Sequence, residues 1–259
     1  MNVPNDKDLQ VLKILVENGI SVFKTVDFLL LSGEKYGKVK YVLSILAATG
    51  HINRIKTDLY CVRNFQNPFV VANAMQSNSI ISYWSALCLH NLTIHIPNVV
   101  YSQSPVQKRD KTVFNIHFKF IKVKLEKMFG EMQMGYANEA FTVTDVEKTL
   151  LDCFDLPQYS GGYAELIHAF SSAKINSPRL LDYGLRMNNI SVLKRMAFLS
   201  ELFKMRGFTR FQQEVLKRMD QKYTLIDPFG ENAGEFNAKW RVRLNISKEN
   251  LLNIIQNIY

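Results

Sequence analysis

The sequence predicts an α+β chain with two domains, a small one over residues 1–66 and a larger one over residues 67–259. Three observations lead to this prediction. The first 66 residues carry three short helical patterns and then two β-prone runs around a polar turn. The stretch Arg63–Pro68 is polar and ends in proline, which marks a boundary. Beyond it, strand patterns precede a mostly helical remainder, as expected of a mixed α/β, helix-rich domain.

The first two helices are predicted from the spacing of apolar residues. One is expected over residues 8–18, with Asn5 or Asp6 as its N-cap and Asn18-Gly19 at its end. A second is expected from about Val22 to Leu31, followed by a turn at Ser32-Gly33. The apolar positions that these helices would bury are Leu9, Leu12, Leu15, Val16, Val22, Val26, Leu29 and Leu30.

The most informative stretch is residues 35–62, KYGKVKYVLSILAATGHINRIKTDLYCV. It begins as a basic helix and reaches Gly50, where a helix C-cap favours a residue that tolerates positive φ. The helix would bury Val39, Val42, Leu43 and Leu46. Ile52–Ile55 and Leu59–Val62 then read as a hairpin across Lys56-Thr57-Asp58. A recognition helix followed by a β-hairpin is the plan of a winged helix-turn-helix, so duplex DNA is the first candidate ligand.

The polar residues of this stretch are the candidate DNA-binding residues. A major groove admits one helix, whose side chains read base edges, while a wing commonly contacts backbone phosphates. On the helix these residues are Lys35, Tyr36, Lys38, Lys40, Tyr41 and Ser44. On the hairpin they are Arg54 and Lys56. The plainer interpretation is a solvated face of a small helical domain, and winged helices also bind proteins.

The first half of the larger domain is predicted to hold two helices and four strands. The helices are Phe69–Met75 and Ile80–His90, the second with Ile81, Trp84, Ala86 and Leu87 inward. The strands are Val99–Ser102, Asn115–Ile121, Met132–Tyr136 and Glu139–Val143. The charged run Gln107–Lys111 is expected in a loop or at a hairpin tip.

The second half is predicted to be mostly helical. Thr144 or Asp145 would cap a helix that reaches about Asp155, with Glu147 as the capping-box partner of Thr144. Lys148 and Asp152 are an i,i+4 pair that can stabilise this helix. The following elements are helices Tyr163–Ala173, Ser177–Met187, Ser191–Lys204 and Thr209–Gln221, strand Trp240–Leu244 and helix Lys248–Ile258.

The basic residues flank a neutral middle. The net charge is +9, with +3 in residues 1–66, zero in residues 67–155 and +6 in residues 156–259. Such an excess favours nucleic acid as a partner. A second basic surface, for DNA, RNA or an acidic protein, would comprise Arg179, Arg186, Lys194, Arg195, Arg206, Arg210 and Arg218. Lys194 and Arg195 would lie near the edge of their helix's buried stripe. Scattered solvating charge is the plainer explanation.

Enzymatic, metal and membrane roles are not expected. The five histidines lack paired metal-ligand spacing, and no nucleotide-binding glycine loop or nucleophile elbow is present, so we expect neither a cofactor nor catalysis. Three widely spaced cysteines argue against a disulfide framework. Without a signal-peptide pattern or an apolar run of membrane-spanning length, the expected location is the cytoplasm.

Three segments in this order resemble the AbiEi family of antitoxins and transcriptional regulators. They are ISYWSALCLHNLT (81–93), VTDVEKTLLDCFDLPQYSGG (143–162) and SVLKRMAFLSELF (191–203), and the most specific part is EKTLLDCFDLPQYSGG (147–162). The family belongs to the type IV toxin–antitoxin and abortive-infection systems of bacteria and archaea, which act in phage defence. The third segment departs from the family at Met196-Ala197-Phe198, where leucine-glycine-aromatic is more usual.

The resemblance implies a role in two parts. The winged helix would bind an inverted-repeat operator in double-stranded DNA and repress its own promoter, and the C-terminal domain would counteract a nucleotidyltransferase toxin of the AbiEii type. Direct contact with that toxin need not occur. The alternatives are an interaction module that sequesters the toxin, a solitary transcriptional regulator and, last, a DNA-targeted nuclease or transferase.

Overall fold

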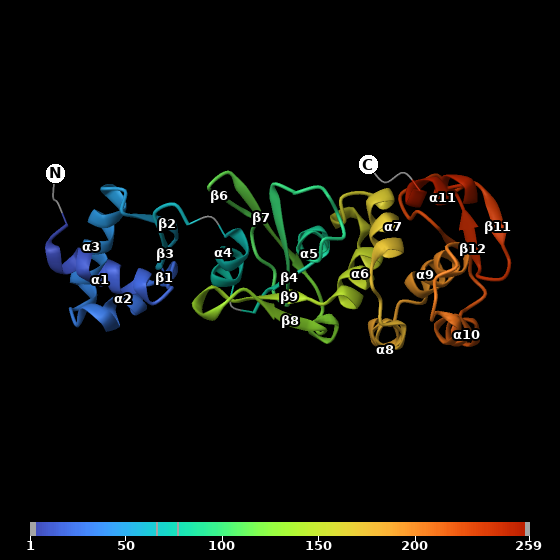
Figure 1. Ribbon diagram of the computed structural model, residues 1–259, viewed down its shortest axis with the longest axis horizontal. Coiled ribbons are helices and arrows are strands. Elements are labelled where there is room, and N and C mark those ends of the chain that lie inside the picture. The colour runs from blue at the N-terminus through green and yellow to red at the C-terminus, as the bar shows by residue number, and fades with distance from the viewer. Residues whose placement is uncertain (1–3, 66, 77, 257–259) are drawn as a thin grey trace. The chain divides into compact units, whose positions relative to one another are not determined.

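The computed structural model describes residues 4–65, 67–76 and 78–256 and divides into two compact units (Figure 1). The first draws on residues 1–81, 98–122 and 132–143, and the second on residues 82–97, 123–131 and 144–259. The described part holds eleven α-helices and three sheets, which confirms the mixed α+β class. The predicted boundary at residue 66 lies outside the described residues.

The first unit begins with three helices and a three-stranded sheet. The elements are α1 (Asp6–Glu17), β1 (Val22–Lys24), α2 (Thr25–Ser32), α3 (Tyr36–Ala48), β2 (Ile52–Lys56) and β3 (Leu59–Val62). Asn5 is the N-cap of α1, since its side chain accepts the Asp8 N–H at 2.8 Å. Helix α3 ends at Ala48 with Thr49 as its C-cap, one residue before the predicted Gly50, which follows with φ +72°.

The residues at the start of the second predicted helix form a strand instead. Val22–Lys24 pairs antiparallel with β3, which places β1 and β2 on either side of β3. The extended backbone buries Phe23, whose ring stacks on Tyr60 at 6.0 Å between centroids. Phe28 then fills the core from α2, whereas Val26 and Leu30, predicted to be buried, are exposed. Packing of one aromatic ring therefore overrides the helical spacing here.

A six-stranded sheet and helix α4 (Pro68–Met75) make up most of the remaining first unit. The strand order is β6-β7-β5-β4-β9-β8, with β5 parallel to β7 and antiparallel to β4. The strands are β4 (Ile80–Ile81), β5 (Val99–Ser104), β6 (Lys111–Val113), β7 (Ile116–Lys122), β8 (Glu131–Met134) and β9 (Phe141–Thr144). Two predictions were wrong: Ile80-Ile81 is a strand rather than a helix start, and Lys111 begins a strand.

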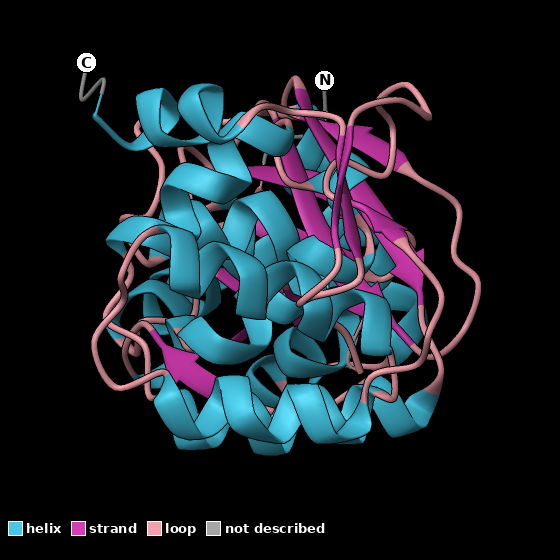
Figure 2. Ribbon diagram, turned by 90° about the vertical axis from the view of Figure 1, so that its right-hand side faces the viewer, coloured by secondary structure: helices cyan, strands magenta, loops and turns pink. Residues whose placement is uncertain are grey.

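The second unit is mainly helical, and its helices contribute to the cyan ribbons of Figure 2. Its helices are α5 (Tyr83–Leu89), α6 (Val146–Asp155), α7 (Tyr163–Ser172), α8 (Ser177–Met187), α9 (Ile190–Leu202), α10 (Thr209–Arg218) and α11 (Lys248–Gln256). A small sheet has the order β10-β12-β11, from Thr224–Leu225, Val242–Leu244 and Glu235–Asn237. Helix α6 packs against α5, α7, α8 and α9, and its residues Glu147–Phe154 are all buried. None of the described helices has the length and apolar character needed to cross a membrane.

Candidate functional site

Helix α3 presents one buried and one exposed face, as its sequence pattern predicts. Val39, Val42, Leu43 and Leu46 are buried in the core of the first unit. The opposite face, together with the residue that precedes the helix, carries the predicted DNA-binding side chains. All of them are exposed, namely Lys35, Tyr36, Lys38, Lys40, Tyr41 and Ser44. The structure therefore exposes all six residues, which are distributed around the part of α3 that faces away from the core.

The turn of the hairpin is attached to this surface through Asp58. Its Oδ1 accepts hydrogen bonds from the Thr25 hydroxyl at 3.0 Å and from the Tyr36 hydroxyl at 3.4 Å, and lies 3.8 Å from Lys40 Nζ. Lys40 Nζ also lies 5.0 Å from the centre of the Tyr36 ring. The hydrogen bond with Tyr36 and the charge of Asp58 raise the pKa of Lys40. The lysine therefore stays charged, and the hairpin turn lies against α2 and α3.

A second acid lies at the start of α3. Glu34 Oε1 is 3.0 Å from Lys38 Nζ and 2.7 Å from Lys7 Nζ, and both lysines lower the pKa of Glu34. Lys7, Lys35, Lys38 and Lys40 thus outnumber the acids that neutralise them, Glu34 and Asp58. The surface around α3 keeps a positive balance, as phosphate binding requires.

The two predicted hairpin residues differ in exposure. Arg54 is exposed on β2. Lys56 is only partly exposed, and its Nζ donates a hydrogen bond to the Met75 carbonyl oxygen at 2.5 Å. Lys56 is therefore not the freely projecting wing residue that the sequence suggested, because the C-terminus of α4 holds its ammonium group.

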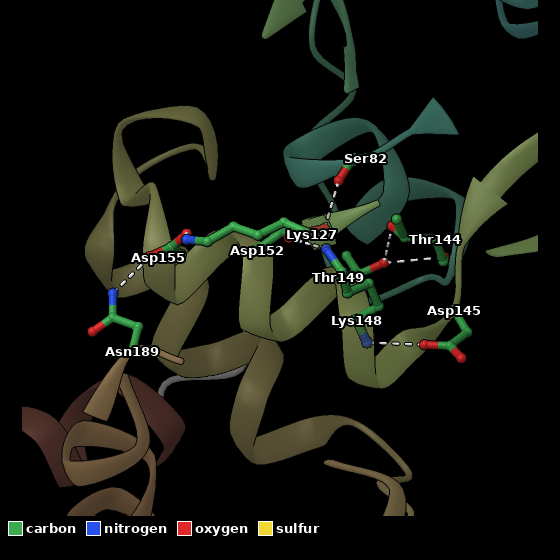
Figure 3. Close-up of polar contacts among 9 residues, drawn as sticks. All are labelled: Ser82, Lys127, Thr144, Asp145, Lys148, Thr149, Asp152, Asp155 and Asn189. Atoms are coloured by element: carbon green, nitrogen blue, oxygen red, sulfur yellow. Dashed lines mark hydrogen bonds and ion pairs between the residues drawn. The ribbon is translucent and has the colours of Figure 1, made fainter. Parts of the chain in front are cut away.

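Helix α6 carries a polar cluster in the second unit (Figure 3). Asp145 is its N-cap and accepts the Lys148 N–H at 2.9 Å. The predicted capping-box role of Glu147 is wrong. Its Oε1 accepts the Asn176 N–H at 2.7 Å, and its Oε2 lies 3.5 Å from Arg179, so this buried carboxylate secures the start of α8.

The ion pair of Lys148 and Asp152 is fully buried, with side-chain exposures of 0% and 3%. Lys148 Nζ donates to Asp152 Oδ1, and the Ser82 hydroxyl donates to Asp152 Oδ2 at 3.1 Å (Figure 3). Lys148 Nζ also lies 5.0 Å from the centre of the Phe129 ring. Spacing alone suggested an ordinary helix-stabilising pair. Because both side chains are shielded from solvent, the pair stabilises the interior of the second unit, and neither group is accessible to a substrate in this conformation.

Residues from three separate stretches of the second unit contribute to this cluster. Ser82 precedes α5, Asp152 and Asp155 lie on α6, and Asn189 is the N-cap of α9. Asp155 accepts from Asn189 Nδ2 at 2.7 Å and from Lys127 Nζ at 2.7 Å (Figure 3). The sequence analysis did not identify Ser82 and Asn189, because the helices were predicted to begin at Ile80 and Ser191, whereas they begin at Tyr83 and Ile190. The cluster thus joins the starts of two helices to α6.

Two of the seven residues predicted for the second basic surface are buried, and the other five are exposed. Residues Val192–Ser200 of α9 are all buried, Lys194 and Arg195 included. Lys194 Nζ donates to Asp220 and to the Lys222 carbonyl oxygen, and Arg195 Nε donates to the Leu225 carbonyl oxygen at 2.8 Å. Both cations tie α9 to the segment around β10. Arg179 and Arg218 form ion pairs, and the guanidinium group of Arg186 lies over the Phe129 ring. In the described structure, Arg206 and Arg210 are exposed and make no contact of either kind.

Metal and thiol chemistry find little support among the described side chains. They contain no group of three or more His, Cys, Asp or Glu placed to hold a metal ion. Cys61, Cys88 and Cys153 are free thiols, and burial raises the pKa of Cys61 to about 11. Thiols of this kind are packing residues rather than nucleophiles.

Comparison with known proteins identifies a fold relative. No protein-family model matches the chain, and no curated protein sequence matches it. The structure is similar to the crystal structure of the RV2827C protein from Mycobacterium tuberculosis, with a TM-score of 0.70 over 99% of this chain and 96% of that one. The two sequences are 13% identical, so the similarity concerns the fold alone.

Proposed function

We propose that this chain is a cytoplasmic, DNA-binding antitoxin of the AbiEi type. Residues 1–66 act as a winged helix that represses the chain's own promoter, and residues 67–259 counteract a nucleotidyltransferase toxin. The observation that carries the proposal is the exposed row of lysines and tyrosines on α3, beside a hairpin attached to that helix through Asp58. The sequence resemblance to the AbiEi family supplies the biological setting.

The dimensions of α3 suit the major groove of DNA. Its 13 residues span about 20 Å, and a helix with side chains is about as wide as the groove. Lys35, Tyr36 and Lys38 lie at the N-terminal end, from which recognition helices commonly contact base edges. Arg54, on the hairpin, is then available for a backbone phosphate.

A salt titration tests the DNA-binding part. Binding to a labelled duplex from upstream of the gene is followed by fluorescence anisotropy over 50–200 mM salt. Lys38→Ala/Lys40→Ala should weaken binding and reduce the slope of log K against log salt by about 1.8, because about 0.9 is lost for each phosphate contact. Lys124→Ala, at a lysine with 77% of its side chain exposed in the second unit, should change neither. Unaltered affinity and slope for the α3 variant would contradict the assignment.

The antitoxin part is tested with the neighbouring reading frame. If that frame encodes a nucleotidyltransferase that arrests growth, co-expression of the full chain should restore growth. Co-purification of untagged toxin would support the alternative in which the chain sequesters the toxin, whereas separate elution would support neutralisation without a stable complex. Absence of such a neighbour would favour a solitary regulator.

A further inference from the structure

Four lysines from three separate stretches of the first unit lie close together. Lys24 ends β1, Lys56 ends β2, Lys108 lies in the loop before β6, and Lys111 begins β6. Lys111 Nζ donates to the Ile55 carbonyl oxygen at 2.6 Å, which attaches the start of β6 to the hairpin beside Lys56. These four residues are called the lysine cluster below.

Three positive charges surround the ammonium group of Lys56. The pKa of Lys56 is lowered by burial first, then by the positive charges of Lys108, Lys24 and Lys111. No carboxylate is among the described groups that act on it. A folded chain that holds four cations together gains stability when an anion binds between them.

Two acids lie near the cluster. Asp110 lies between Lys108 and Lys111 in the sequence, but its carboxylate faces His117 at 3.6 Å and accepts the Phe120 N–H at 3.4 Å. Asp27 lies beside Lys24, whose backbone N–H it accepts at 2.7 Å. Four lysines against these two carboxylates leave the cluster with a net positive charge.

The cluster adjoins the surface of α3. Lys56 stands two residues before Asp58, which contacts both Tyr36 and Lys40 of α3. Lys24 directly precedes Thr25, whose hydroxyl donates to the same carboxylate. A single nucleic-acid backbone that passes α3 at the hairpin turn would therefore meet the cluster next.

We propose that the lysine cluster is a second phosphate-binding site. The loop Gln107–Lys111 then acts as an additional wing, which contacts DNA backbone phosphates beyond the segment that α3 contacts. The proposal rests on the proposed DNA-binding function and extends it. The sheet domain then lengthens the bound segment, and it adds affinity without reading bases.

The experiment combines one double variant with two lengths of duplex. Lys24→Ala/Lys108→Ala removes two exposed members of the cluster and leaves the hydrogen-bonded Lys56 and Lys111 in place. On a duplex of about 40 base pairs, the slope of log K against log salt should fall by about 1.8, so the loss of affinity between 50 and 200 mM salt is about tenfold smaller than for wild type. On the shortest duplex that still binds α3, the two proteins should behave alike. Lys124→Ala/Lys174→Ala, at two exposed lysines of the second unit, is the charge-matched control, and superimposable thermal unfolding curves exclude misfolding.

Each other outcome overturns the inference in a distinguishable way. If the cluster variant keeps the wild-type slope on the long duplex while Lys38→Ala/Lys40→Ala loses affinity, the second site is wrong and the winged helix stands. If neither variant changes binding, or wild type binds no duplex, both proposals fail. If the cluster variant loses affinity for single-stranded RNA of equal length but not for duplex DNA, the cluster serves RNA, and the assignment to the DNA backbone is wrong.

Discussion

The buried pair of Lys148 and Asp152 leads to a quantitative prediction of stability. Replacing Asp152 by Ala leaves an ammonium group with 0% exposure without its counter-charge and leaves the Ser82 hydroxyl without its acceptor. Breaking a buried ion pair by removing one partner costs about 3–5 kcal/mol. We expect Asp152→Ala to destabilise the second unit by this amount, which is a large share of a typical domain stability of about 5–15 kcal/mol.

The isosteric double variant separates the pair from its surroundings. Lys148→Met/Asp152→Asn removes both charges, nearly preserves the volume of each side chain and keeps an acceptor for the Ser82 hydroxyl, so it should recover much of the loss, since removal of both charges of a buried pair is often far less costly than removal of one. Arg218→Ala breaks an i,i+4 pair with Glu214 in the same unit, but the side chain of Arg218 is 46% exposed. Arg218→Ala should lower the free energy of unfolding by less than about 1 kcal/mol.

Tryptophan fluorescence in a urea titration is the assay. The sequence has two tryptophans, Trp84 and Trp240, and both belong to the second unit, so their signal follows that unit. A decrease of less than about 1 kcal/mol in the free energy of unfolding for Asp152→Ala would refute the reasoning, because breaking a buried ion pair costs more than this. A double variant as unstable as the single one would refute it too, since packing rather than charge would then dominate.

Three further predictions concern the second unit and the thiols. Gly161 has φ +84°, and a Cβ at this position would lie 2.6 Å from Trp84 Cε2. Gly161→Ala should therefore lower the melting temperature and change the fluorescence emission of Trp84. A Cβ at Gly162 would meet open space, so Gly162→Ala should leave this emission unchanged. Burial raises the pKa of Cys61 to about 11 and raises that of Cys88, so a thiol reagent at pH 8 should label half-buried Cys88 before Cys61, and reversal of that order would contradict the packing. Hydrogen bonding to Lys194 lowers the pKa of Asp220, so this carboxylate stabilises the fold above its unfolded pKa and the contribution is lost as pH falls through the lower folded pKa. Asp220→Asn should therefore flatten the stability curve below about pH 4, measured by thermal melting from pH 2 to 6, and an unchanged curve would count against the ion pair.

Local signals in the sequence predict most helices, and long-range packing explains the errors. The capping asparagine at residue 5 and the apolar spacing locate α1 well, and Ser177–Met187 is predicted to the residue. Strand β1 escapes prediction because Val22–Lys24 is extended only through its pairing with Cys61, Tyr60 and Leu59, some forty residues away. Ile80-Ile81 is a strand for the same reason, as it pairs with β5 and β9.

The candidate functional residues also fall into two groups, those that local sequence signals predict and those that only the fold brings together. The exposed face of α3 is predictable because Val39, Val42, Leu43 and Leu46 define its opposite side. The lysine cluster is not, since its members lie up to 87 residues apart, from Lys24 to Lys111, and meet only through the fold. An i,i+4 pair such as Lys148 and Asp152 has the same spacing on a surface helix as on a buried one. The sequence of the pair therefore does not indicate that α6 is buried.

In the proposed complex with DNA, the contacts of Asp58 bear on how quickly the chain binds a duplex. Because this carboxylate already contacts Thr25, Tyr36 and Lys40, the hairpin turn holds its place against α3 before a ligand arrives. Immobilising a flexible side chain during binding costs about 0.5–1.5 kcal/mol, and for Tyr36 and Lys40 much of that ordering occurs when the chain folds. Encounter then resembles the docking of rigid bodies, with a rate set by long-range electrostatic attraction rather than by loop rearrangement.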